Sequence, residues 1–308
     1  MKKYLKLAGN ILMIISLIYL SIMMYNIGID IKNYLNKAVI VSSFWIVFYL
    51  FILLFLSPFN FKIILDLISG VNNNFIKVYS YYYKANLYKY IPSNVIQYLA
   101  RNELALDGVL KHSDVAFASF LEIVCVSIAS FLCAIVFSRH FVLLWIAENE
   151  SLIPMIVVVI MSLLILGFIV SRLFKEQLSK FILLYKSLFK CKNLLRIIIV
   201  IFIYMVSLTL GAMLYVQVLG MFSVSISSEI YFQVLGLYIF AWIIGFATPG
   251  APGGIGIREA VMIYFFSNIF SASVITLSAC MYRLLSIASE LLAFCLSMIL
   301  IKKKKWGK

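Results

Sequence analysis

The sequence predicts an all-α, polytopic membrane protein that forms a single integral membrane domain over residues 1–308. Three observations predict this class. Hydrophobic residues make up 64% of the chain and charged residues only 12%, a balance that water-soluble domains of this length do not carry. Apolar windows of about 20 residues, long enough to cross hydrocarbon, recur along the chain. The Lys and Arg residues gather between these windows and at both ends of the chain.

Hydrophobic windows define the spans that we expect. They lie over residues 7–27, 39–57, 115–137, 152–173, 194–219, 230–248 and 273–301. The first window follows a basic start and is longer than the core of a signal peptide. No small-residue cleavage site follows it, so we expect it to be retained as the first span.

The basic residues predict which loops face the cytoplasm. The N-terminus, residues 58–114, residues 172–196 and the C-terminal tail hold 3, 6, 7 and 5 of the 26 basic residues. We therefore expect both termini on the cytoplasmic side. Because the formal charge of +14 follows this pattern, nucleic acid is not an expected partner, whereas anionic lipid headgroups are.

Two cytoplasmic termini require an even number of crossings, and the short apolar segment 259–270 supplies the eighth. A helix of 12 residues is only about 18 Å long and cannot cross about 30 Å of hydrocarbon alone. We expect residues 230–270 to form one discontinuous element that breaks at Pro249–Gly256 and returns. A backbone broken at membrane depth persists only where it is buried in protein or lines a wet cavity.

Residues 58–114 form a second irregular region, too polar to span and too aromatic for a solvated loop. Three asparagines at 72–74 precede the run YSYYYKANLYKYIP at 79–92, and tyrosines favour the membrane–water interface. We expect interfacial or re-entrant helices, a break at Pro92, and a second helix that Ser93 or Asn94 caps and that runs through Arg101. The tyrosine-rich run is either an interfacial belt or a platform for acyl chains or sugars.

The stretch TPGAPGGIGIREA at 248–260 breaks a span and places two charges beside the break. In one interpretation, Arg258 clamps a phosphate headgroup through its planar guanidinium. Gly253, Gly254 and Gly256 would then let backbone N–H groups approach the same anion at a helix N-terminus.

Ionisable side chains inside apolar spans are costly, so each is a candidate functional residue. The set comprises Glu122, Arg258, Glu259, Arg283 and Glu290. The alternative to a headgroup clamp is that Arg258 pairs with one of the three glutamates, and a salt bridge that opens to admit phosphate would combine both. Arg283 and Glu290 share one helix face, and mutual pairing is their alternative role, as it is for Glu122.

Arg101 is either a positive-inside anchor or a second phosphate contact at the cytoplasmic membrane surface. The sequence contains no motif for nucleotide binding, thiol redox chemistry, catalysis or metal binding. The nucleotide patterns GxxxxGK[ST] and GxGxxG both fail near Gly254, and the five cysteines form no CxxC pair. No Ser/His/Asp set, HExxH or Asp-rich metal motif is present. We therefore expect no enzyme activity, no cofactor and no metal.

Three stretches resemble the membrane region of the lysylphosphatidylglycerol synthase/flippase family. They are KYIPSNVIQYLAR at 89–101, DGVLKHSDVAFASFLEIV at 107–124 and TPGAPGGIGIREA at 248–260. The last is similar to a proline–glycine–glycine–Leu/Ile–Gly–aliphatic–Arg–Glu signature of the family. CMYRLLS at 280–286 is similar to its Tyr–Arg–Leu pattern.

This resemblance implies a fold with broken or re-entrant helices and an activity that moves an amphiphilic lipid between leaflets. The site residues that it implies are Pro92, Arg101, Glu122, Gly253, Gly254, Gly256, Arg258, Glu259 and Arg283. The chain departs from the family pattern at Ser93, where glycine is usual. It also has no aminoacyl-transferase domain within its 308 residues, so the resemblance leaves the flippase activity rather than the synthase activity.

The leading hypothesis is therefore a flippase of the bacterial cytoplasmic membrane that moves an anionic or aminoacylated phospholipid, or a lipid-linked sugar. One alternative is an intramembrane transferase with Glu122 or Glu259 as acid or base. The other is a membrane scaffold whose partner is a glycosyltransferase or lipid synthase.

Overall fold

The computed structural model describes residues 36–90, 96–105, 110–148, 191–222, 226–248, 254, 256–267 and 269–305. Regular structure in this part of the chain is entirely helical. Within these residues, five helical segments are long and apolar enough to cross a membrane, which supports the prediction of a helical, multi-pass membrane protein. The predicted spans 7–27 and 152–173 lie outside the described residues, as do Pro92 and Gly253.

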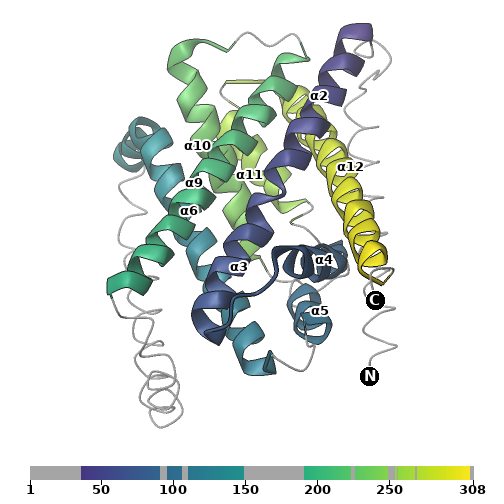
Figure 1. Ribbon diagram of the computed structural model, residues 1–308. Coiled ribbons are helices and arrows are strands. Elements are labelled where there is room, and N and C mark those ends of the chain that lie inside the picture. The colour runs from purple at the N-terminus through teal and green to yellow at the C-terminus, as the bar shows by residue number, and fades with distance from the viewer. Residues whose placement is uncertain are drawn as a thin grey trace, which may run out of the picture.

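Five of the predicted spans correspond to long helices that run along the bundle (Figure 1). The helices are α2 (Lys37–Leu53), α6 (His112–Glu148), α9 (Cys191–Gly220), α10 (Ser228–Ala247) and α12 (Ala272–Lys305). Their outward faces carry exposed large apolar side chains, among them Phe44, Phe202 and Leu291. An apolar surface of this kind is suited to lipid and not to water.

Helical structure continues beyond residue 57, the predicted end of the second span. Helix α3 (Leu56–Ser69) follows α2 after a short turn, and the two form one apolar segment from Lys37 to Ser69. Pro58 permits this because it lies in the first turn of α3, where a missing N–H breaks no helical hydrogen bond. Phe61, Ile64 and Leu65 then bury one face of α3.

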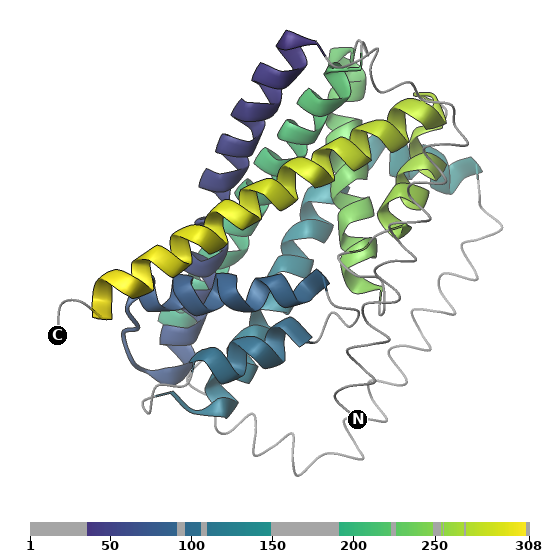
Figure 2. The ribbon, with the colours of Figure 1, turned by 90° about the vertical axis from the view of Figure 1, so that its right-hand side faces the viewer.

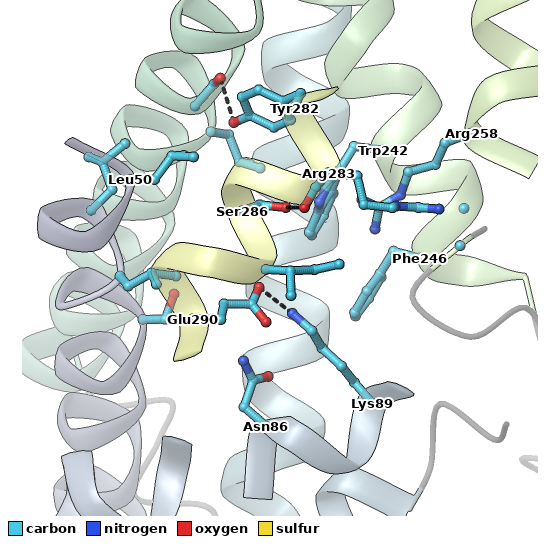
Figure 3. Close-up of a pocket in the computed structure, with 18 of the residues that line it drawn as sticks. Leu50, Asn86, Lys89, Trp242, Phe246, Arg258, Tyr282, Arg283, Ser286 and Glu290 are labelled. Atoms are coloured by element: carbon cyan, nitrogen blue, oxygen red, sulfur yellow. Dashed lines mark hydrogen bonds and ion pairs between the residues drawn. The ribbon is translucent and has the colours of Figure 1, made fainter. Parts of the chain in front are cut away.

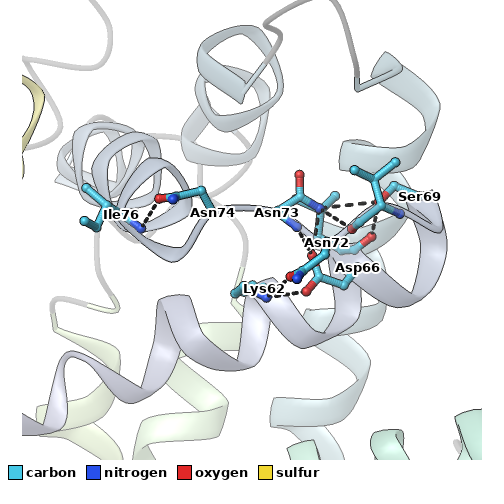
Figure 4. Close-up of polar contacts among 9 residues, drawn as sticks. Lys62, Asp66, Ser69, Asn72, Asn73, Asn74 and Ile76 are labelled. Atoms are coloured by element: carbon cyan, nitrogen blue, oxygen red, sulfur yellow. Dashed lines mark hydrogen bonds and ion pairs between the residues drawn. The ribbon is translucent and has the colours of Figure 1, made fainter. Parts of the chain in front are cut away.

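A corner built by the three consecutive asparagines ends α3 and begins α4 (Phe75–Asn86) (Figure 4). Gly70 closes α3 in the left-handed conformation with φ 69°. The Asp66 carboxylate pairs with Lys62 and accepts from the Asn73 backbone N–H at 2.8 Å. Asn74 caps α4 by accepting from the Ile76 N–H at 3.0 Å. The polar run therefore specifies a rigid turn.

Helices α4 and α5 (Ile96–Ala105) lie across one end of the bundle (Figure 2), and the 3₁₀ turn η2 (Leu87–Tyr90) follows α4. Two helices separated near residue 92, the second running through Arg101, match the expected arrangement. The start of α6, the start of α9 and the end of α12 lie at this same end (Figure 1). The described parts of three segments predicted to be cytoplasmic, from 58–114, 172–196 and the C-terminal tail, thus lie at one end of the bundle.

Most of the tyrosine-rich run is buried and forms neither an interfacial belt nor an exposed platform, whereas Tyr88 at its end is exposed. Tyr79, Tyr81, Tyr82 and Tyr83 are all buried in the core between α3, α4, α6 and α12. Three of these hydroxyls have acceptors inside the protein: that of Tyr79 donates to the Ala293 carbonyl at 3.2 Å, that of Tyr82 to Glu122 and that of Tyr83 to the Leu54 carbonyl. Buried tyrosine is favourable when its hydroxyl is paired. Residues 78–83 are all buried, because α3, α5 and α12 enclose α4.

Helix α10 descends through the bundle and α11 (Ile257–Phe266) returns beside it, as predicted for a discontinuous element (Figure 2). With 10 residues, α11 is about 15 Å long, half of the hydrocarbon thickness. Helix α10 packs most extensively against α6. Gly236 makes that contact possible, because a Cβ there would lie 2.0 Å from the Ser138 hydroxyl, at the kink of α6.

Candidate functional site

A cavity of about 750 Å³ lies inside the bundle, lined by side chains from α2 through α12 (Figure 3). Each described candidate residue except Gly256 lines it, namely Arg101, Glu122, Gly254, Arg258, Glu259, Arg283 and Glu290. Trp242, Glu122 and Glu290 belong to candidate spans, so the cavity lies at the depth of the spans. Charged residues that are widely separated in sequence therefore meet in one cavity, whose lining is otherwise mostly apolar.

One wall of the cavity is a closed buried cluster around Glu122. One carboxylate oxygen pairs with the Arg101 guanidinium. The other oxygen accepts from the hydroxyls of Tyr82, at 2.8 Å, and Tyr204, at 2.9 Å. Because three donors on α4, α5 and α9 converge on one carboxylate of α6, the cluster ties the crossing helices to the bundle.

The environment of Arg101 differs from both predicted roles. Its side chain is only 2% exposed, and its Cζ lies 4.0 Å from the Tyr82 ring centroid and 4.6 Å from that of Phe61. Burial acts to lower the pKa of Arg101, but the Glu122 carboxylate raises it above its ordinary value. Arg101 is thus a permanently charged, internal residue and not a contact at the membrane surface.

Burial has the opposite effect on the Tyr82 hydroxyl: it raises the pKa well above its ordinary value, and the nearby Glu122 charge raises it further. Tyr82 therefore remains a protonated donor to Glu122. The carboxylate has all its partners inside the protein, which makes this wall a structural element of the site.

Helix α12 contributes two further ion pairs. Arg283 Nη1 lies 3.2 Å from Glu259 Oε1, and Glu290 pairs with Lys89 of η2 (Figure 3). Arg283 and Glu290 share a helix face as predicted, yet each pairs with another element. Lys89 was not among the predicted site residues, and its position just before the Pro92 break was the only signal in the sequence.

The glycine-rich stretch makes a sharp entry into α11. Gly254 and Gly256 have φ of 75° and 83°, values that side chains with a Cβ rarely adopt. Glu259 accepts from the Gly256 N–H at 2.7 Å. This N–H therefore already has an acceptor within the protein, contrary to the expectation that it would face a bound anion.

Arg258 lies in a slot between two glycines. A Cβ on Gly245 would lie 2.4 Å from Arg258 Cγ, and one on Gly254 would lie 2.8 Å from its Nε. Gly245 was not singled out in the sequence, because a glycine in an apolar helix carries no signal for what packs on it. The guanidinium lies over the Trp242 ring, with Cζ 5.4 Å from the centroid.

Among the residues that the structure describes, Arg258 makes no ion pair and no side-chain hydrogen bond. The sequence suggested three glutamates as partners for Arg258, and each pairs with another cation. Glu122 pairs with Arg101, Glu259 with Arg283 and Glu290 with Lys89. A guanidinium that lines a cavity and has no carboxylate partner of its own can bind an anion there.

Comparison with protein-family models, with curated proteins and with solved structures gave no match. Within the described part of the chain, no group of three or more His, Cys, Asp and Glu side chains has the arrangement of a metal site.

Proposed function

We propose that this protein moves an amphiphilic lipid across its membrane, with the headgroup passing through the cavity while the acyl chains stay in lipid. The observation that carries the proposal is Arg258, a guanidinium inside a cavity at span depth that has no carboxylate partner among the described residues. Charge at membrane depth is costly, and a headgroup phosphate supplies the missing partner.

The broken helix gives the proposal its geometry. Helices α10 and α11 form a hairpin at whose turn the backbone bends through positive-φ glycines. Irregular backbone at membrane depth is tolerated where it is buried in protein or lines a water-filled cavity, and Gly254 lines this cavity. Among the described residues, the three neighbouring ion pairs add charged groups to the mostly apolar walls and leave one cation for the ligand.

The test is lipid movement in vesicles reconstituted with the full chain, followed by dithionite access to a fluorescent phospholipid. We expect Arg258→Gln to lower the rate by about tenfold or more, since a hydrogen bond to a charged group contributes about 1.5–3 kcal/mol. Gly245→Ala should lower it too, because the added Cβ displaces the Arg258 side chain.

The matched control is Gly220→Ala, where the added Cβ meets nothing within 4 Å. It should move lipid at the wild-type rate. Equal rates for wild type, Arg258→Gln and Gly245→Ala would reject transport through this cavity. A scaffold for a lipid synthase or glycosyltransferase would then be favoured, and headgroup chemistry detected by mass spectrometry would favour a transferase.

A further inference from the structure

The charges that line the cavity do not balance. In the described residues the lining contains four cationic side chains, Lys89, Arg101, Arg258 and Arg283, and three carboxylates, Glu122, Glu259 and Glu290. Each carboxylate pairs with its own cation. Among the described residues the excess is a single positive charge, and Arg258 is the cation of this set with no paired carboxylate.

The paired cations are not readily available to a ligand. Releasing Arg101 or Arg283 would leave Glu122 or Glu259 charged and buried, with side-chain exposures of only 7% and 4%. Removing one partner of a buried pair is strongly unfavourable. Glu259 also caps the start of α11 through the Gly256 N–H, so it cannot turn away without disturbing the helix that carries Arg258.

Building on the transport proposed above, we infer that the cavity selects a headgroup with one net negative charge, the charge of a phosphodiester. One phosphate pairs with Arg258 and neutralises the cavity. The second charge of a phosphomonoester or diphosphate would have to disrupt one of the three pairs at low dielectric. A cationic aminoacyl headgroup would meet the same excess positive charge and be disfavoured.

The residues around Arg258 also fix the orientation of its guanidinium, which favours a phosphodiester by geometry as well as by charge. Gly245 and Gly254 confine the Arg258 stem, and Trp242 stacks with Phe246 at 5.2 Å between ring centroids. A guanidinium held on an aromatic face presents its edge, which is the geometry for bidentate contact with two phosphate oxygens. A diester retains two such oxygens and has two esterified ones that need no cation.

Binding to the purified full chain tests the inference separately from transport. Short-chain phosphatidylglycerol, phosphatidic acid, phosphatidylcholine and lysyl-phosphatidylglycerol are titrated by microscale thermophoresis. At about pH 8 a phosphomonoester carries nearly two charges. We expect phosphatidylglycerol to bind at least about tenfold more tightly than the other three. Equal affinities, or tighter binding of phosphatidic acid, would overturn the inference.

Two variants change the charge count. Arg258→Gln should remove the preference for phosphatidylglycerol over phosphatidylcholine. Glu290→Gln removes the carboxylate that pairs with Lys89 and should shift the ratio of phosphatidic acid to phosphatidylglycerol affinity by about tenfold toward phosphatidic acid. Glu103→Gln is the control, because it removes an exposed carboxylate from α5 that does not line the cavity.

The outcomes separate the two proposals. If Glu290→Gln changes the ratio no more than Glu103→Gln, the charge inference is wrong even where the vesicles still show lipid movement. If the binding order holds and the vesicles show none, the charge selection stands and the cavity belongs to a lipid-binding protein instead. A Glu290→Gln chain that does not fold leaves the wild-type series and Arg258→Gln to decide.

Discussion

Two arginines in the same cavity have opposite environments. Arg101 is bound to Glu122 within a cluster that two tyrosine hydroxyls complete. Arg258 rests on Trp242 and between two glycines, with no carboxylate partner among the described residues. Both were read in the sequence as potential phosphate contacts. The comparison teaches that a charged residue at membrane depth becomes structural when its counter-ion is built into the protein, and available for a ligand when it is not.

The largest expected effect on stability is at Arg101, the arginine that is paired within the protein. Arg101→Met leaves Glu122 charged and buried, and breaking a buried pair costs about 3–5 kcal/mol. We expect an unfolding free energy lower by that amount, measured by denaturant titration in detergent. Arg101→Met combined with Glu122→Gln should lose less than Arg101→Met alone, because the amide oxygen still accepts from Tyr82 and Tyr204. A double variant as unstable as the sum of both singles would contradict the buried-pair interpretation.

An intermediate effect is expected where a glycine permits contact between two helices. A Cβ on Gly236 would lie 2.8 Å from the Ser138 backbone nitrogen as well as close to its hydroxyl. Since backbone cannot yield as a long side chain can, Gly236→Ala should destabilise the protein by about 1–3 kcal/mol. Gly245→Ala should destabilise it less, because it meets the flexible Arg258 side chain.

The difference between Gly236→Ala and Gly245→Ala can be tested by two measurements on the same samples. Unfolding free energy should rank Gly236→Ala as the more damaging change, and lipid movement per folded protein should rank Gly245→Ala as the more damaging one. The same ranking in both measurements would mean that the Gly245 slot only supports packing.

The smallest effect on stability is expected at Arg258. The sign of the change in unfolding free energy is informative. Arg258→Met removes a partly buried charge that has no ion-pair partner among the described residues, so its desolvation cost disappears. The loss of the Trp242 contact, about 0.5–2 kcal/mol, offsets part of this gain. We expect the unfolding free energy to change by no more than about 1 kcal/mol, whereas lipid movement falls. A loss of 3 kcal/mol or more, as at Arg101, would make Arg258 a structural residue.

The sequence by itself determined the class of protein and the places of most helices. Spans predicted at 115–137, 194–219 and 230–248 lie inside α6, α9 and α10 or within a residue of them, because about 20 apolar residues at helical spacing have one stable form in hydrocarbon. The same physics singled out Glu122, Arg283 and Glu290 in the spans, and Arg258 and Glu259 beside the break, since charge in an apolar span is costly and therefore conspicuous. It did not single out Lys89. It also placed the break between α10 and α11, where proline and glycine interrupt the apolar run.

Only the tertiary structure decided which charges neutralise one another. Glu122 and Arg101 are 21 residues apart in the chain, and Glu290 and Lys89 are 201 apart. Their pairing depends on how helices rotate and cross, which local periodicity does not contain. The buried tyrosines of α4 and the Gly245–Gly254 slot were missed for the same reason. A side chain's role in a membrane bundle is set by the neighbour that the fold brings to it, and Arg258 is distinguished because, among the described residues, the fold brings it an aromatic ring and no carboxylate.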